Sequence, residues 1–232
     1  MTKIRIVSAL LAIPILCVAP SFGVQTATMT LTGTGQNGVL GNVYIGPYVA
    51  TINNIPNLQV ICDDFVDNSY LNESWTANVV TLPNIAGTDF ASQGLQKYEQ
   101  AAWLTLQLLS PPTTCGGGNC AGDIQYAIWQ LFDSTGQHTP LSYLSPPDLG
   151  NAQGWLTQAA AHYTDPGIDY SRFSIYTPNL SDPITCSGHA CTSAPPQEFM
   201  TVSTPEPPGL AILGTDLSAL GLLVFFLRRR LI

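Results

Sequence analysis

Two apolar segments, one near each end of the chain, limit the folded domain to the residues between them. Residues 6–18 form an apolar run that follows Lys3 and Arg5 and precedes small and turn-forming residues up to Gly23. A positive start, an apolar run of this length and a small residue at the break are typical of a secretory signal peptide. We therefore expect signal peptidase to remove residues 1–23.

The second apolar segment has the length of a membrane-spanning helix. Residues 209–227 are nearly all apolar and cover roughly 28 Å at helical rise, about one hydrocarbon core. Asp216 interrupts the stretch and costs about 3 kcal/mol at the bilayer centre. Arg228, Arg229 and Arg230 follow directly and should stay cytoplasmic, which places the upstream residues outside the inner membrane.

A short proline motif precedes this segment. Pro205, Glu206 and Pro207 are followed by the apolar stretch and the arginine cluster, and this order closely resembles the PEP-CTERM sorting signal. The resemblance assigns residues 204–232 to that signal. It implies that a membrane enzyme, the exosortase, cleaves near the motif, so that a domain first anchored in the inner membrane reaches the cell surface or the extracellular matrix. Asp216 and the additional Pro208 depart from the usual pattern.

The residues between the two ends, 24–203, are enough for one acidic domain with its own core. Lys97 and Arg172 are its only basic residues, against thirteen acidic ones, which gives a net charge of −11. Such a surface repels phosphate backbones, so nucleic acid is not an expected partner. The sequence has neither a phosphate-binding glycine loop nor a zinc-binding helix motif. We therefore expect no metal, no cofactor and no enzymatic turnover.

The residue periodicity changes twice along the domain. Four segments rich in Thr, Val and Tyr predict strands: 26–33, 43–52, 58–66 and 74–82. Helical spacing then predicts helices at 95–109, from near Asp123, where a carboxylate can cap free amides, and at 151–162. Residues 173–177 and 198–203 return to the strand pattern. The order predicts an α+β fold, a β-sandwich or barrel with a small inserted helical lobe.

The spacing of the cysteines indicates two local disulfides. Cys115 and Cys120 bracket a four-residue loop, and Cys186 and Cys191 bracket another. Disulfides persist outside the cytoplasm, so two bridges are the simplest interpretation. A metal site with His189 is the alternative, although the spacing is not that of a zinc site. Cys62 is then left without a local partner.

Cys62 follows Ile61 in a strand that is expected to be buried, where a thiol can act as a small hydrophobic side chain. A second interpretation comes from the expected helix, in which Ile124 and Gln125 are followed by Ile128 and Trp129. This pattern resembles the glutamine motif of bacterial surface thioester domains. The resemblance implies that the Cys62 sulfur attacks the Gln125 carboxamide, that ammonia leaves, and that a Cys–Gln thioester remains inside the fold.

A thioester survives only where water is excluded. The apolar neighbours expected to form the shell are Ile61, Phe65, Ile128 and Trp129. Gln125 near a helix start would place its carbonyl oxygen close to free backbone amides, which stabilise a developing oxyanion. The near absence of lysine leaves few internal amines to consume the bond.

Two functions therefore remain open. The first is adhesin-like covalent attachment, in which an amine or hydroxyl of an unidentified partner attacks the Cys62–Gln125 thioester. The second is a passive extracellular matrix protein with a buried, unreactive Cys62. Two weaker alternatives are a thiol hydrolase that pairs Cys62 with His138 or His162, and a calcium site. The oxygen-bearing residues considered for calcium are Asp63, Asp64, Asp67 and Asn68.

Overall fold

The computed structural model describes residues 25–133, 136, 139–186 and 194–203. The expected signal peptide and the PEP-CTERM segment, with Pro205, Glu206, Pro207 and the arginine cluster, lie outside these residues. Within the described ranges, no helix is both long and apolar enough to cross a membrane.

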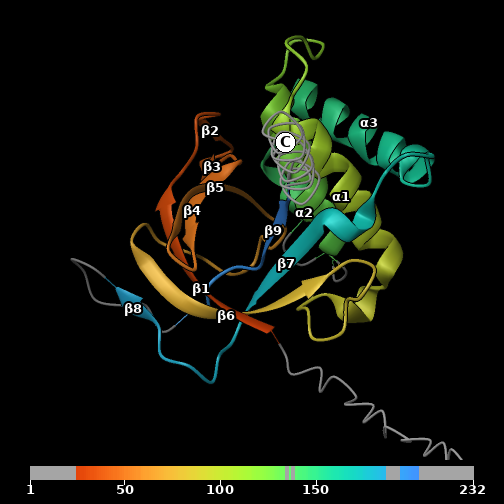
Figure 1. Ribbon diagram of the computed structural model, residues 1–232. Helices are drawn as coiled ribbons and strands as arrows, with labels where there is room; N and C mark the ends of the chain where they lie inside the picture. The colour runs from red at the N-terminus through yellow and green to blue at the C-terminus, as the bar shows by residue number, and fades with distance from the viewer. Residues whose placement is uncertain (1–24, 134–135, 137–138, 187–193, 204–232) are drawn as a thin grey trace, which may run out of the picture.

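Six antiparallel strands close into a β-barrel (Figure 1). Around the barrel they are β1 (Gln25–Gly33), β4 (Tyr48–Ile52), β5 (Ile55–Cys62), β9 (Phe199–Val202), β7 (Phe173–Pro178) and β6 (Glu73–Thr81). The ring closes because β6 pairs back onto β1, with Gln25 opposite Val79 and Thr30 opposite Ser74. The short β8 (Thr185–Cys186) extends the edge of β6, while β2 (Val39–Leu40) and β3 (Val43–Tyr44) form a separate hairpin. The α+β class and the barrel alternative are thus confirmed.

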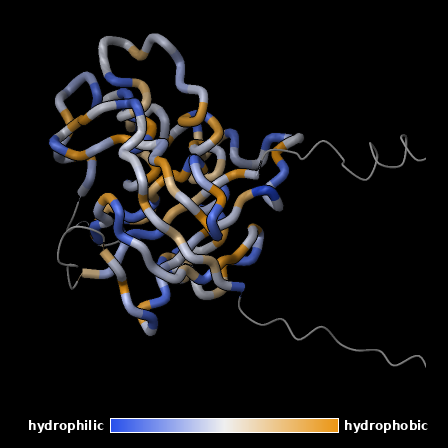
Figure 2. Tube along the Cα trace, turned by 60° about the vertical axis from the view of Figure 1, so that its left-hand side comes forward, coloured by the Kyte–Doolittle hydropathy of each residue, from blue (hydrophilic) through white to orange (hydrophobic). Residues whose placement is uncertain are grey.

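The barrel interior follows from strand alternation, which sends every second side chain inward. On β1 the buried side chains are Ala27, Met29 and Leu31, and on β6 they include Trp75 and Ala77. In Figure 2 the hydrophobic segments run through the middle of the molecule, where strands and helices meet. The two-residue period in the sequence therefore fixes which face of each strand forms the core.

Three helices lie in sequence between β6 and β7 and pack together beside the barrel (Figure 1). They are α1 (Leu95–Leu109), α2 (Cys120–Phe132) and α3 (Pro146–His162). Every residue of α2 except Gln130 is buried. A helix that is covered all round must be central to its fold, and α2 accordingly packs against both α1 and α3.

Several expected boundaries were wrong for local physical reasons. The expected strand 43–52 is interrupted at Pro47, which has no N–H to donate to a strand ladder. The expected strand 58–66 ends at Cys62, because the Asp64 carboxylate accepts hydrogen bonds from the backbone N–H groups of Val66 and Asp67 and forms a turn.

Both later helices begin earlier than expected. Helix α2 is capped by Asn119, whose side-chain oxygen accepts from the Gly122 N–H at 3.0 Å, and not by Asp123. Asn at this position satisfies an amide that has no partner inside the helix. Helix α3 starts at Pro146, a residue whose fixed φ suits the first helical turn.

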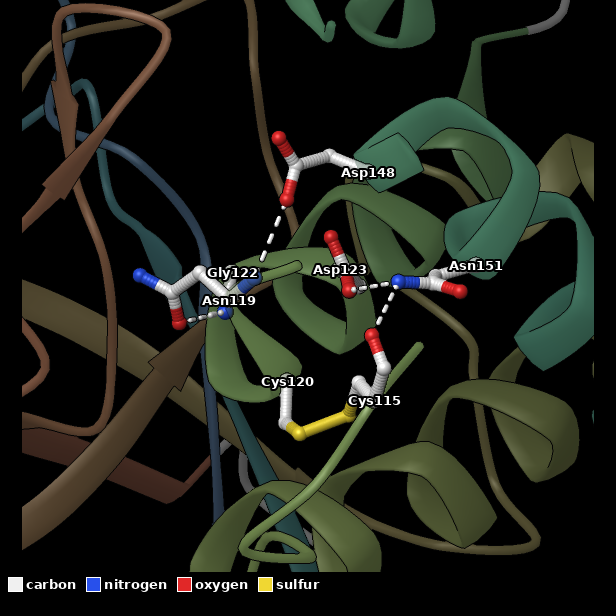
Figure 3. Close-up of a disulfide and its surroundings, with 7 residues drawn as sticks. All are labelled: Cys115, Asn119, Cys120, Gly122, Asp123, Asp148 and Asn151. Atoms are coloured by element: carbon white, nitrogen blue, oxygen red, sulfur yellow. Dashed lines mark hydrogen bonds between the residues drawn. A yellow bond between two sulfur atoms is a disulfide. The ribbon is translucent and has the colours of Figure 1, made fainter. Parts of the chain in front are cut away.

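The Cys115–Cys120 disulfide predicted from the sequence is present and ties the preceding loop to the first turn of α2 (Figure 3). The Asn151 side chain donates to the Cys115 carbonyl at 2.8 Å and so holds this loop against α3. Cys191 lies outside the described residues, so its pairing with Cys186 stays a prediction.

The first prediction concerns this disulfide. The two cysteines are five residues apart, so opening the loop should lower the free energy of unfolding by about 2 kcal/mol through the entropy of the unfolded chain. Urea unfolding of the Cys115→Ser/Cys120→Ser variant should show the loss, and reductant should then have no further effect through this loop. An unchanged unfolding midpoint would contradict this contribution.

Candidate functional site

The structure brings Cys62 and Gln125 into direct contact. The Gln125 side-chain amide donates to the Cys62 backbone carbonyl, with Nε2 and O 2.7 Å apart, and both residues are fully buried. Cys62 is the last residue of β5, and Gln125 lies in the second turn of α2. The contact therefore joins the barrel to the helical lobe at a point that water does not reach.

The Cys62 thiol is held in its protonated form. It donates to the Asp64 carbonyl, with Sγ and O 2.9 Å apart. Burial raises the pKa of the Cys62 thiol well above its ordinary value, and the neighbouring Asp64 and Asp63 carboxyl groups add to the rise. The Trp129 indole nitrogen, which has no well-formed hydrogen bond, lies near the sulfur and opposes this rise in pKa. A thiol in this environment is a poor free nucleophile.

The histidines considered for a thiol hydrolase do not support that alternative. His162 stacks on Trp103, with ring centroids 5.7 Å apart, and its Nδ1 lies 2.8 Å from the Asp165 carboxylate near the end of α3. His138 lies outside the described residues. The thiol also sits at the end of a strand, where no helix N-terminus lowers its pKa.

The Gln125 carbonyl oxygen is buried without a hydrogen-bond partner. The sequence-based expectation that it would meet free amides at a helix start was wrong, because α2 begins five residues earlier, at Cys120. The oxygen instead faces Gly46, where an added Cβ would lie 2.7 Å from Oε1. Gly46 thus leaves room for the carboxamide, a role that the sequence alone did not reveal.

Of the four residues expected to form the shell, Trp129 lies near the Cys62 sulfur, and all four belong to the hydrophobic core or pack against it. Ile61, Ile128 and Trp129 are at most 1% exposed, while Phe65 is only half-buried. The Phe65 ring centroid lies 5.0 Å from that of Trp129 and 6.1 Å from that of Tyr126. The three rings pack against one another on the Trp129 side of the site.

Two tyrosines that the sequence analysis did not single out cover the site from the hairpin side. The Tyr126 hydroxyl donates to the Leu40 carbonyl at 3.0 Å and so fastens the β2–β3 hairpin to α2. The Tyr48 hydroxyl donates to the Tyr44 carbonyl at 2.6 Å. Burial raises the pKa of the Tyr48 phenol, and the nearby Cys62 sulfur adds to the rise. Tyr48 therefore lies close to Cys62 and Gln125.

A pair of buried carboxyl groups lies next to Cys62. The Asp63 N–H donates to the Glu198 backbone carbonyl at 3.4 Å, and both side chains are at most 1% exposed. The Glu198 carboxyl group accepts from the Tyr98 hydroxyl at 2.6 Å and from the Thr177 hydroxyl, whereas neither oxygen of Asp63 has a hydrogen-bond partner. Burial and mutual repulsion raise the pKa of Asp63 well above its ordinary value.

This pair changes the interpretation of the acidic residues around Cys62. The Asp63 and Asp64 side chains are both buried. Among the described residues, no cluster of His, Cys, Asp and Glu side chains has the arrangement of a metal site. The calcium alternative thus gains no support. Glu198 was missed because one acidic residue at the start of a short strand carries no recognisable pattern.

A polar network holds the first turn of α2 in place (Figure 3). The Asp148 carboxylate accepts from the Asn119 N–H at 3.0 Å, and the Asn151 amide donates to Asp123 at 3.0 Å. Burial raises the pKa of Asp123 to about 7, with the Asp148 carboxylate adding to the rise and the Asn151 hydrogen bond opposing it. This network orients α2 and hence Gln125.

The second prediction is a pH dependence of stability that arises from Asp123. Its pKa is about 7 in the folded protein and about 3.9 in an unfolded chain. Between these values the folded state keeps a proton that the unfolded state releases, so stability should fall as the pH rises from about 4 to about 7. Asp123→Asn preserves the neutral hydrogen bonds and should be more stable than the parent at pH 8 by on the order of 1 kcal/mol.

Urea unfolding at pH 5 and pH 8 checks this expectation. The exposed Asp182→Asn substitution is the control, because it should leave the difference between the two pH values unchanged. An Asp123→Asn variant with the same pH dependence as the parent would show that this carboxyl group is ionised in the folded protein at both pH values.

The third prediction tests the space at Gly46. A methyl group there meets both the Gln125 oxygen and the Tyr48 ring, so Gly46→Ala should lower the free energy of unfolding by about 1–3 kcal/mol. Gly150→Ala is the matched control, because its Cβ meets no atom within 4 Å and it lies in α3. That substitution should be neutral or stabilising. Equal stability of the two variants in urea unfolding would mean that Gln125 does not occupy this space.

Comparison with known proteins gives no match to a protein-family model, to a curated protein or to a solved structure.

Proposed function

We propose that Cys62 and Gln125 form an internal thioester, and that the domain uses it once to attach covalently to a partner outside the cell. The observation that carries the proposal is the 2.7 Å hydrogen bond from the Gln125 side chain to the Cys62 carbonyl in a fully buried site. It places the carboxamide of one residue against the backbone of the other, although 63 residues separate them.

Bond formation needs no reagent beyond the two side chains. The Cys62 sulfur attacks Cδ of Gln125, the S–C bond forms, and the C–N bond breaks. The thiol proton goes to the departing nitrogen, which leaves as ammonia. The Gln125 carbonyl oxygen has no hydrogen-bond partner in the folded structure. No hydrogen bond to that oxygen therefore has to break when it moves during the attack.

The surroundings favour a thioester that persists. Ile61, Ile128 and Trp129 exclude water, and the Asp63 and Asp64 carboxyl groups disfavour negative charge on the sulfur. A thiolate that is energetically costly to form is a poor leaving group, so water and other unselected nucleophiles cleave the thioester slowly. The same features keep the unreacted thiol inert, which is the property that the passive-protein alternative requires.

Attachment follows when a partner amine or hydroxyl attacks Cδ of Gln125. The C–S bond then breaks, the proton of the nucleophile goes to the Cys62 sulfur, and an amide or ester remains. The bond is consumed in one event, so the protein is not proposed to be an enzyme. Export by signal peptidase and sorting by an exosortase are part of the proposal and rest on the sequence at the two ends of the chain.

The fourth prediction is the mass of the full chain before and after treatment with methylamine. If the thioester forms, the untreated chain should lack the mass of one ammonia in addition to the hydrogens lost to disulfides. Methylamine should then add once, at Gln125, and should expose one new thiol at Cys62. Intact-mass spectrometry and thiol titration measure both changes.

Two variants serve as controls. Cys62→Ala and Gln125→Ala should each abolish the mass deficit and the methylamine uptake, while an exposed substitution such as Leu180→Ala should leave both unchanged. A full mass together with a Cys62 thiol that is indifferent to methylamine would sink the covalent function and leave the passive extracellular protein.

A further inference from the structure

A pocket of about 400 Å³ opens at the surface, and Tyr48 and Gln197 are among the residues that line it. It lies between the β2–β3 hairpin, the start of β4 and residues 68–71. Its chemistry is defined by three tyrosines and three side-chain amides: Tyr44, Tyr48, Tyr70, Asn42, Asn68 and Gln197. None of the described residues that line it is charged, although the chain as a whole has a net charge of −8.

Two of these residues connect the pocket to the reactive pair. Tyr48 is one of the residues that line the pocket, and its ring packs at Gly46, near the Gln125 oxygen. Gln197 donates to the Asp64 carbonyl at 2.7 Å, and the same carbonyl accepts the Cys62 thiol at 2.9 Å. A ligand in the pocket would thus contact residues that themselves hold Cys62 and Gln125.

A second cavity is too small to be the route of entry. It lies beside Trp129 and Phe65, holds only about 20 Å³, and its lining is mostly aromatic. That is room for roughly one water molecule, whereas a partner must bring a nucleophilic group together with the atoms that carry it. Of these two cavities, only the tyrosine-lined pocket has room for a partner.

We propose that the tyrosine-lined pocket binds a neutral saccharide unit and presents one of its hydroxyl groups to Gln125; the covalent part of this inference rests on the proposed function. Tyrosine rings pack against the apolar C–H faces of a sugar ring, and amide side chains donate to and accept from its hydroxyl groups. Tyr44 and Tyr70 are 55% and 42% exposed, so both rings are accessible to a ligand.

Because no charged residue lines the pocket, a neutral ligand is favoured over a charged one. A lysine side chain would enter as an ammonium ion, and no carboxylate lines the pocket to balance it. A phosphate or sulfate group would find no basic side chain there. An uncharged ligand with many hydroxyl groups matches the lining, because it needs hydrogen-bonding groups and aromatic surface but no counter-charge.

A hydroxyl nucleophile also has to be held in position before it can react. A hydroxyl group is a weak nucleophile, and holding it against Cδ of Gln125 supplies a large effective concentration. The sugar oxygen then attacks Cδ, the C–S bond breaks, the hydroxyl proton goes to the Cys62 sulfur, and an ester to Gln125 remains. Methylamine is smaller and more nucleophilic, so its reaction should not depend on the pocket.

The fifth prediction separates binding from covalent chemistry. The full chain carrying Cys62→Ala, applied to an array of neutral and charged oligosaccharides, should bind neutral members. Adding Tyr44→Ala and Tyr70→Ala should weaken that binding at least tenfold, because both aromatic faces are lost. Tyr143→Ala is the matched control, since Tyr143 is similarly exposed, at 57%, but does not line the pocket. Its binding should equal that of Cys62→Ala alone.

The reaction with methylamine tests the covalent chemistry independently of saccharide binding. In a chain with Cys62 intact, Tyr44→Ala/Tyr70→Ala should take up methylamine as the parent does, while its ester formation with the bound oligosaccharide should be lost. Binding to no neutral saccharide, or preference for charged ones, would overturn the saccharide subsite even if methylamine labels Gln125. Saccharide binding without any methylamine uptake would keep the subsite and overturn the thioester.

Discussion

The hydrogen bond between the Gln125 side chain and the Cys62 carbonyl is the contact on which the arrangement of the site depends. It lies where the end of β5 meets α2, so it fixes the helical lobe against the barrel at a fully buried point. A buried amide must find a partner or lose about 1–3 kcal/mol. The carboxamide therefore cannot turn away from Cys62 unless another acceptor replaces that carbonyl.

Buried acidic residues distinguish the contact between β5 and α2 from an ordinary apolar core. Asp63, Asp64 and Glu198 gather around the Cys62 backbone, and the described part of the domain has only Lys97 and Arg172 as basic residues, neither of which pairs with them. With no cation to balance them, burial raises the pKa of Asp63 and Glu198, which favours their protonated forms. The resulting environment resists a thiolate at Cys62, so the sulfur is stable either as a thiol or as part of a neutral thioester.

Local patterns in the sequence predicted the elements better than their ends. The helical spacing around α1 and α2 and the alternation in β1 and β6 were sufficient to predict these elements, because the period of the apolar residues differs between a helix and a strand. The closure of β6 onto β1 could not be predicted, since pairing between distant strands leaves no local signal. Asn119 was overlooked as the cap of α2 because Asp123 offered the same chemistry four residues later.

At the site, too, the sequence predicted what short local motifs encode but not what depends on contacts between distant segments. Cys62 and Gln125 were paired on two short motifs, and the structure places them in contact. The residues that shape their surroundings were not predicted: Gly46 and Tyr48 come from one segment and Gln197 and Glu198 from another, and each is ordinary in its own stretch of sequence. Only the fold brings together the space for the carboxamide, the wall of the pocket and the buried acid.

Stability and reactivity place opposite demands on such a site, and the structure separates them in space. On the Trp129 side, aromatic rings cover the pair and leave room for about one water. On the other side, the Tyr48 ring packs at Gly46, near the Gln125 oxygen, and Tyr48 also lines the pocket that opens to solvent. Its hydroxyl group donates to the Tyr44 carbonyl of the hairpin. In the proposed function, a saccharide that packs against Tyr44 and Tyr48 would therefore contact the ring that lies beside the buried carboxamide.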